Sequence, residues 1–141
     1  MEQEPFILSE SVQDNITFGL PYIKDKFDYI SKLACLEEDY DQLAKGQLTE
    51  IGERGVNLSG GQKAWISLAR ALYSNAELYL LDDPLSAVDP KVSSQLMQGA
   101  ILNHLKEKTC ILVTHQLHVL SKADRILYLD EGEIKFLGNY L

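Results

Sequence analysis

Two short segments of the sequence contain the residue types that bind phosphate and metal. The first is Ser59-Gly60-Gly61, which we expect to open a helix because Ser is a favourable N-cap residue. The start of a helix presents unpaired backbone N–H groups and a positive dipole end, which together favour a phosphate. The second is an apolar run over 78–81 that ends in Asp82 and Asp83. A carboxylate there could hold Mg²⁺ beside the phosphate, so the two segments together predict nucleotide chemistry.

One half of a nucleotide site is absent from the sequence. The pattern G-x-x-x-x-G-K-[ST], whose backbone N–H groups and Lys hold the phosphates of a nucleotide, does not occur in the 141 residues. The sequence therefore predicts a partial site.

The elements that must position these residues follow an alternating order. Apolar residues at helical spacing and strong caps predict helices, while short apolar runs predict strands buried on both faces. We expect helices over 25–36, 60–73, 89–106 and 117–122, and strands over 78–81, 110–113, 126–129 and 133–137. This order favours an α/β fold with a parallel sheet and helical crossovers. A turn at Glu131-Gly132 leads into the last strand.

Composition limits the class of protein. A chain of 141 residues with 45% apolar and 24% charged residues is one globular domain at most. The net charge of −8 argues against a nucleic-acid partner, which requires a basic face. We find no signal peptide and no apolar run of the roughly 18–20 residues that cross a membrane.

The cysteines and histidines do not predict a metal site. Cys35 and Cys110 form no C-x-x-C pattern, so we expect two reduced, buried thiols of a cytosolic protein. His115 and His118 could share a metal, but no third ligand is placed near them.

Four segments resemble the motifs of ABC transporter nucleotide-binding domains. Residues 53–63 resemble the signature segment, 81–89 the Walker B and D-loop, 113–116 the switch-histidine segment and 3–7 the Q-loop. They occur in the family's order and spacing and cover nearly all of the chain. Asp83 and the sequence around both loops resemble the first nucleotide domain of the multidrug-resistance-associated, or C, subfamily.

The resemblance implies a fold and a domain organisation. We expect a partial P-loop NTPase fold, with a mostly parallel sheet, helical crossovers, a helical signature subdomain and a C-terminal β-hairpin. Residues 1–75 would hold the Q-loop, helical subdomain and signature, and 76–141 the Walker B, D-loop, switch histidine and C-terminal strands. The Walker A strand, absent here, would lie between the strands at 110–113 and 126–129. We therefore expect an N-terminally truncated fragment of a longer protein.

The resemblance also implies a function. The domain would bind and hydrolyse ATP with Mg²⁺, coupled to export across a membrane, on whose cytoplasmic face it would lie. Its partners would be a second nucleotide-binding domain in a head-to-tail dimer and the transmembrane domains of the same transporter. One alternative is a non-catalytic interaction module that donates its signature to a partner. Another, a soluble ABC ATPase of translation or DNA repair, is opposed by the negative charge and the subfamily-C sequence.

Some site residues are expected to serve the partner's nucleotide. By resemblance, Ser59, Gly60, Gly61 and Gln62 would cap the γ-phosphate of the ATP held by the opposite domain. Taken alone, the same residues would also suit an ordinary N-capped helix with a Gly turn. Asp89 is expected to cap the helix that follows it, and by resemblance to contact the partner across the dimer.

Other residues are expected to form the chain's own pocket. Asp82 would bind Mg²⁺, through water, because Mg²⁺ keeps much of its hydration shell. By resemblance, Gln3 would sense the metal and the attacking water, and His115 would be a switch that contacts the γ-phosphate. Asp83 stands at the position of the catalytic carboxylate, which polarises the attacking water. The plain alternatives are a strand-end acid, an uninformative Gln near the chain end and a core histidine.

Two positions depart from the family pattern. Competent ABC sites usually carry Glu where Asp83 stands, and the shorter side chain sets the carboxylate back by roughly 1–1.5 Å, a misplacement that can cost on the order of 100-fold in rate. We therefore expect ATP binding with poor hydrolysis at this pocket. Trp65 replaces a usual Arg, which we interpret as packing or as an altered domain contact. The isolated chain is expected to be inactive, with negligible ATP affinity and poor folding.

Overall fold

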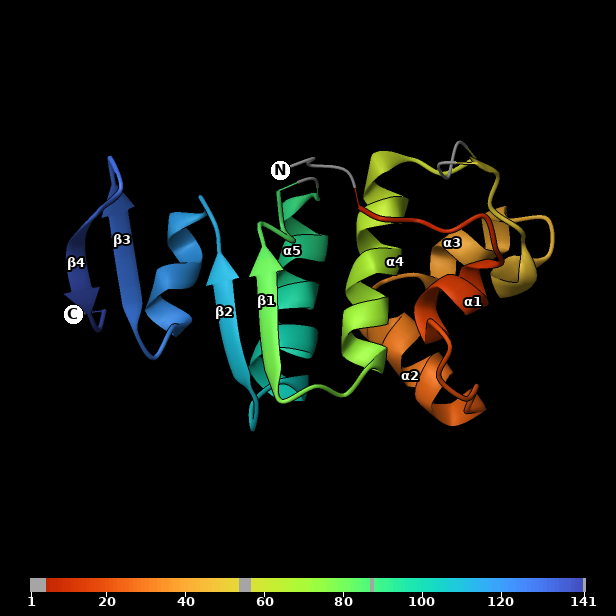
Figure 1. Cartoon of the computed structure of the whole chain (residues 1–141), viewed down its shortest axis with the longest axis horizontal. Helices are drawn as coiled ribbons and strands as arrows, with labels where there is room; N and C mark the ends of the chain where they lie inside the picture. Colours follow the sequence, from red (N-terminus) through yellow and green to blue (C-terminus); the bar gives the residue numbers. More distant parts are fainter. Residues whose placement is uncertain (1–4, 54–56, 87, 141) are drawn as a thin grey trace.

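The computed structural model describes residues 5–53, 57–86 and 88–140. A group of helices, α1 to α4, occupies one end of the molecule and a β-hairpin, β3–β4, the other, with β1, β2 and α5 between them (Figure 1). The described chain is therefore a mixed helix-and-strand structure with one small parallel and one small antiparallel sheet.

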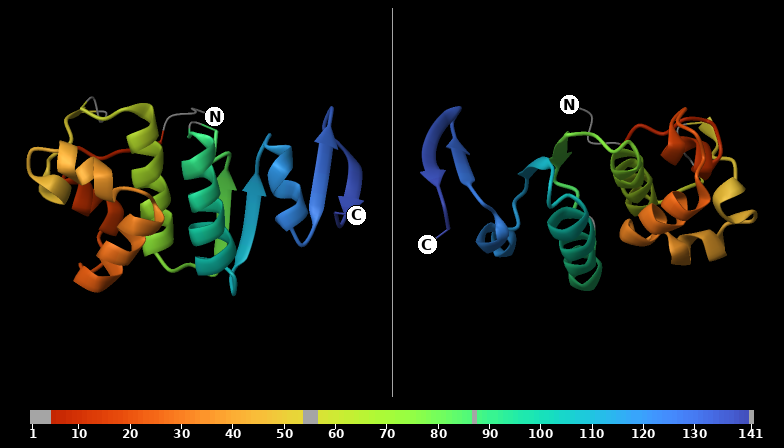
Figure 2. Two further views of the ribbon diagram at one scale, coloured as in Figure 1. Left: turned by 180° about the vertical axis from the view of Figure 1, so that it is seen from behind. Right: turned by 90° about the horizontal axis from the view of Figure 1, so that it is seen from below.

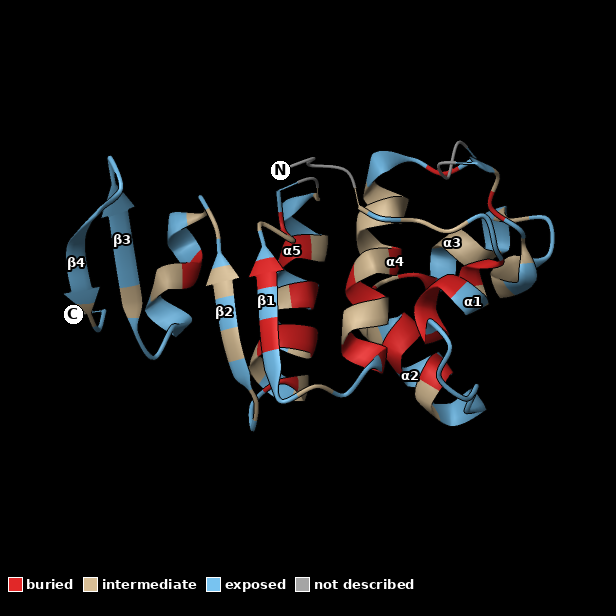
Figure 3. Cartoon of the chain, viewed as in Figure 1, coloured by how far each residue is buried: buried red, intermediate tan, exposed pale blue. Residues whose placement is uncertain are grey.

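The helical group is built around α4, Gly60–Tyr73. Its apolar residues recur at helical spacing, so one stripe is buried, and α1 and α2 pack against it. Tyr73 closes this core: its hydroxyl donates to the Pro21 carbonyl at 2.8 Å and accepts from the Ile23 N–H at 3.0 Å. The buried residues accordingly follow α4, α1, β1 and α5 (Figure 3).

The helical group also contains α2, Lys24–Leu33, and three shorter helical segments. Two of them, α1 (Val12–Thr17) and α3 (Glu37–Gln42), were not predicted, because six residues are too few for a periodic pattern. The third is the 3₁₀ turn η1, Gly46–Leu48.

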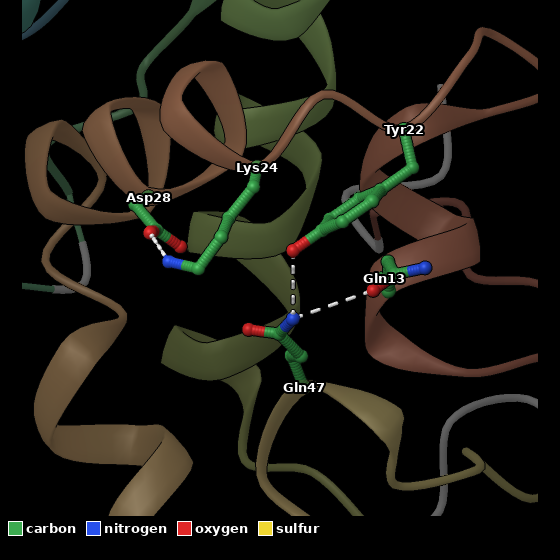
Figure 4. Close-up of polar contacts among 5 residues, drawn as sticks. All are labelled: Gln13, Tyr22, Lys24, Asp28 and Gln47. Atoms are coloured by element: carbon green, nitrogen blue, oxygen red, sulfur yellow. Dashed lines mark hydrogen bonds and ion pairs between the residues drawn. The ribbon is translucent and has the colours of Figure 1, made fainter.

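Side-chain bonds hold η1 onto α1. The Gln47 amide Nε2 donates to Gln13 Oε1 at 3.3 Å and to the Tyr22 hydroxyl at 3.2 Å (Figure 4). An exposed ion pair between Lys24 and Asp28 lies on the neighbouring helix α2.

The parallel pair joins β1, Leu78–Asp82, to β2, Thr109–Val113. Between them the chain forms α5, Pro90–Leu96, and continues as a π-helical stretch, η3, Met97–His104. The predicted strand–helix–strand unit is therefore present. Its helical layer lies on one side of the strands (Figure 2).

The prediction that both faces of these strands are buried is wrong for the described structure. Leu80 is 69% exposed and Ile111 54%, while Tyr79 and Leu81 on the other face are buried. The reason is that an apolar run establishes only that both faces can be buried. Here α5 and η3 cover one face, and the other has no layer over it among the described residues.

The C-terminal hairpin forms as predicted. After the 3₁₀ segment η4, Leu117–Lys122, strand β3 (Ile126–Asp130) pairs antiparallel with β4 (Glu133–Gly138). The two turn residues, Glu131 and Gly132, both have positive φ, +48° and +78°, as a two-residue hairpin turn requires. No ladder joins β2 to β3 in the part of the chain that is described.

Among the described helices, none combines the length and apolarity needed to cross a lipid bilayer.

Candidate functional site

The start of α4 is fixed by a reciprocal cap. Ser59, in extended conformation, accepts through Oγ from the Gln62 N–H at 3.1 Å, and its own N–H donates to Gln62 Oε1 at 2.9 Å. This capping box satisfies two backbone donors. It sets the first turn at an exposed position, with Ser59 and Gly60 both open to solvent.

Two backbone donors of that turn find no partner in the described part of the chain. Within the described residues, the N–H groups of Gly60 and Gly61 have no acceptor. A Cβ built at Gly60 would meet no atom within 4 Å, and at Gly61 the nearest atom is a Trp65 ring carbon at 3.8 Å. The packing of this chain therefore does not require glycine at either position. Two glycines at a helix N-terminus leave their N–H groups without a neighbouring Cβ, an arrangement that suits a phosphate.

The side chain of Gln62 is committed to supporting this turn. Its Oε1 takes part in the cap, and its Nε2 donates to Asp39 Oδ1 of α3 at 2.7 Å. Gln62 thus ties the start of α4 to α3. Its direct contact with a nucleotide stays a prediction.

Trp65 lies one turn further along α4, half-buried and packed against the hydrophobic core. Its Nε1 is buried without a hydrogen-bond partner in the described structure. This placement agrees with the packing interpretation.

The acidic residues lie where β1 ends. Asp82 is its last residue and is exposed. Asp83 follows with φ +46°, its N–H donates to the Val113 carbonyl at 2.8 Å, and its Oδ1 accepts from Thr114 Oγ1 at 3.4 Å. Because β1 and β2 are parallel, their carboxyl ends meet at one edge of the sheet. The exposed His115 follows β2 at that edge, so the structure brings Asp82, Asp83 and the segment containing His115 together.

Gln116 connects the loops that follow the two strands. Its Nε2 donates to the Leu85 carbonyl at 2.7 Å, its Oε1 accepts from Ser93 Oγ at 3.3 Å, and its N–H donates to Thr114 Oγ1 at 3.1 Å. The sequence places Gln116 in the switch-like segment, but nothing in the sequence indicates that its amide spans the β1 and β2 loops.

Asp89 is the N-cap of α5, as predicted. Its Oδ1 accepts from the N–H groups of Lys91 at 2.9 Å and Val92 at 3.1 Å. Its contact across a dimer stays a prediction. Gln3, together with residues 54–56 and 87 of the motif segments, lies outside the described residues.

The donor set fits a phosphate-bound metal better than a metal held by protein alone. Among the described residues there is no cluster of three or more His, Cys, Asp and Glu side chains. A single exposed carboxylate such as Asp82 is compatible with Mg²⁺, which binds through one or two carboxylates, substrate phosphates and water.

The two cysteines are free thiols, and both are half-buried, so the prediction that they are buried is wrong. Each lies at the margin of the core, not inside it. Burial raises the pKa of both thiols, and nearby Glu38 and Glu37 raise that of Cys35 further.

Comparisons with known proteins agree with the family resemblance. Residues 1–86 match the family described as ABC transporter. ABC transporter C family member 2 of Dictyostelium discoideum is 54% identical over 130 residues, which are 92% of this chain and 9% of that protein. ATP-binding cassette sub-family C member 4 of Mus musculus is 49% identical over 140 residues, 99% of this chain and 11% of that protein. ABC transporter C family member 9 of Arabidopsis thaliana is 46% identical over 138 residues, 98% and 9% respectively.

The chain spans about a tenth of the length of the curated relatives it matches. The family match over more than half of the chain and the identities near one half show that the chain belongs to the ABC transporter family, in its C subfamily.

Proposed function

We propose that this chain forms part of the ATP-binding domain of an ABC transporter and donates the N-terminus of α4 to a nucleotide held by a second nucleotide-binding domain. The observation that carries the proposal is the pair of N–H groups at Gly60 and Gly61, which find no acceptor among the described residues and whose glycines are not required by packing. An oriented donor pair of this kind stabilises an anion delivered from outside the chain. The printed names of the relatives, which include "ATP-binding cassette", support ATP as that anion.

The chain's own pocket is proposed to lie at the carboxyl edge of β1 and β2. Asp82 would hold Mg²⁺ through water, and His115 and Gln3 would contact the γ-phosphate and the attacking water. Bound ATP would supply the reactive phosphoryl group, and Mg²⁺ would neutralise part of the charge of its phosphates. Asp83, one methylene shorter than Glu and hydrogen-bonded to Thr114, would be a weak base, so this pocket would bind ATP and hydrolyse it slowly.

The remaining features of the proposal concern the parent protein. Residues 1–75 and 76–141 would be two parts of a P-loop NTPase fold. The domain would lie at the cytoplasmic face of a membrane, coupled to transmembrane domains that export a substrate. The alternative, a non-catalytic module that donates α4 to a partner, would also place Gly60 against the partner's nucleotide. Under that alternative, no ATP would bind beside Asp82.

The test uses Gly60→Asp in the full-length transporter, with Gly60→Asn as the matched neutral control. Asp in the first turn of a helix favours the helix dipole, so thermal stability is expected to be unchanged or higher. The same carboxylate would repel the phosphate, and we expect transporter ATP turnover to fall by at least about 10-fold, more than for Asn. Equal turnover for Asp, Asn and wild type, with all three folded, would overturn the proposal.

A further inference from the structure

Gln116 fastens the segment after β2 to the loop after β1 and to α5. Its Nε2 donates to the Leu85 carbonyl at 2.7 Å, and its Oε1 accepts from Ser93 Oγ at 3.3 Å. Both anchors belong to the interior of the molecule, because Leu85 is completely buried and Ser93, on α5, is 3% exposed. A side-chain amide that donates through one end and accepts through the other is fixed in position and in orientation.

The segment that Gln116 holds leaves the sheet after Val113, where the pairing of β2 with β1 ends. In the described part of the chain, two side-chain bonds hold the residues beyond that point against the loop after β1. One runs from Thr114 Oγ1 to Asp83 Oδ1 and, at 3.4 Å, is long for a hydrogen bond. The other, from Gln116 to the Leu85 carbonyl, is 2.7 Å. Gln116 is therefore the stronger of the two constraints on where this segment lies.

His115 stands between the two residues that are held. Its side chain is exposed, whereas Thr114 and Gln116 on either side are half-buried. The Gln116 N–H donates to Thr114 Oγ1 at 3.1 Å, which closes a turn around His115. The place of the His115 backbone therefore depends on its two neighbours.

By the proposed function, on which this inference rests, His115 contacts the γ-phosphate of ATP in the chain's own pocket. We propose that Gln116 is a positioning residue that holds His115 in reach of that phosphate and so gives the pocket a preference for ATP over ADP. ADP lacks the γ-phosphate and gains nothing from a correctly placed imidazole. A displacement of about 1 Å is enough to lose a directed contact. In this role Gln116 touches no nucleotide itself.

The experiment measures nucleotide preference at this pocket in the full-length transporter. A photoreactive ATP analogue is crosslinked, and proteolysis between the two nucleotide-binding domains separates the label at this pocket from the label at the partner's. Displacement of the label by ATP and by ADP gives a half-displacement concentration for each nucleotide.

The first variant is Gln116→Leu, which keeps the approximate size of the side chain but removes both of its bonds. We expect it to raise the half-displacement concentration of ATP by about 10-fold, as for the loss of one hydrogen bond to a charged group. The concentration for ADP should stay within about twofold of wild type. The ADP value also checks folding, because a pocket that has collapsed loses both nucleotides.

Two further variants keep the test decisive. Gln116→Glu keeps an acceptor for Ser93 but turns a carboxylate instead of a donor toward the Leu85 carbonyl, so it should weaken ATP binding as Gln116→Leu does. Gln98→Leu is the matched control, because it makes the same change on an exposed side chain of η3 and should leave both concentrations at wild-type values. A wild-type ratio of the two concentrations in either Gln116 variant, or an equal loss of ATP and ADP, would overturn the inference.

A double variant separates the positioning of His115 from general support of the loop. If Gln116 acts through His115, adding Gln116→Leu to His115→Ala raises the ATP concentration by no more than about twofold, because the contact is already lost. Effects of the two substitutions that simply multiply would contradict the inference.

Failure of the inference is distinguishable from failure of the proposed function. If His115→Ala leaves the preference for ATP over ADP unchanged, the proposed role of His115 at this pocket fails. If His115→Ala lowers the preference while Gln116→Leu preserves it, only the inference on Gln116 fails.

Discussion

Under the proposed function, Asp83 combines two properties that would weaken it as a catalytic base. It is one methylene shorter than Glu, and its Oδ1 accepts a hydrogen bond from Thr114. Its backbone is left-handed and tied to Val113, so the main chain has little freedom to advance the carboxylate. How far the carboxylate at position 83 reaches therefore depends on the length of its side chain.

We predict that Asp83→Glu raises hydrolysis at this pocket by about 10- to 100-fold, because a longer side chain brings the carboxylate to the attacking water. The measurement is ATP turnover of the full-length transporter with its second pocket inactivated. The control is Asp83→Asn, which should change turnover little, since a weak base has little to lose. A Glu variant no faster than wild type would contradict the assignment of Asp83.

At the scale of elements, the amide side chain of Gln62 ties α4 to α3. Gln62→Glu would keep an acceptor for the Ser59 N–H but place a carboxylate against Asp39. We predict a loss of about 1–2 kcal/mol in the free energy of unfolding. Urea denaturation of the parent nucleotide domain measures it.

The double variant Gln62→Glu with Asp39→Asn provides the control, because it restores a donor facing an acceptor. Its stability should return toward that of wild type. If the double variant loses as much free energy of unfolding as Gln62→Glu and Asp39→Asn lose separately when added together, the contact between α3 and α4 contributes nothing to stability.

Tyr40 gives the helical group a dependence on alkaline pH. Burial raises the pKa of Tyr40 to about 12, despite the hydrogen bond between its hydroxyl and Ser31 Oγ at 2.8 Å. In the unfolded chain this phenol ionises near pH 10. Between about pH 10 and pH 12 the unfolded state has lost a proton that the folded state retains, so stability falls as pH rises through this window.

We predict that Tyr40→Phe removes this contribution, of up to about 2 kcal/mol, and flattens the stability profile above pH 10. The profile comes from thermal unfolding of the parent domain at successive pH values. Below pH 10 the variant should be less stable by about 1 kcal/mol, because Ser31 is left without its partner. Parallel profiles for the two proteins at all pH values would refute the assignment.

The elements differ in how far the sequence could predict them. Strong caps at Ser59 and Asp89 located the starts of α4 and α5, and the turn at Glu131-Gly132 located the hairpin, because each depends on local chemistry. The contacts of Arg70 could not be predicted, since its guanidinium donates to the carbonyls of Asn15 and Phe6, more than 50 positions away. Likewise Leu80 is exposed although its run is apolar, because burial depends on what packs over the strand.

At the scale of the whole molecule, large apolar side chains are exposed on both sheets. They occur on β1, β2, β3 and β4 and include Leu80, Ile111, Leu129 and Ile134. Exposed apolar faces and unpaired strand edges favour association.

We predict that a polypeptide of these 141 residues alone associates in solution and binds Mg-ATP negligibly, because its sequence has no P-loop Lys to hold the phosphates. Size-exclusion chromatography and isothermal titration with Mg-ATP measure both properties. The parent nucleotide domain is the control. Micromolar ATP binding by a monomeric 1–141 chain would contradict the prediction.

Arg70 and Asn15, joined by a side-chain hydrogen bond, have a consequence for how the protein tolerates change during evolution. Arg70 donates to the Phe6 carbonyl and Asn15 to the Leu8 carbonyl, so replacing the side chain of Phe6 or Leu8 leaves these acceptors in place. Statistical covariation between these positions and Arg70 should accordingly be weak. The length of the stretch from 6 to 15 is what these bonds constrain. Homologous sequences should therefore show substitutions in this stretch but no single-residue deletions.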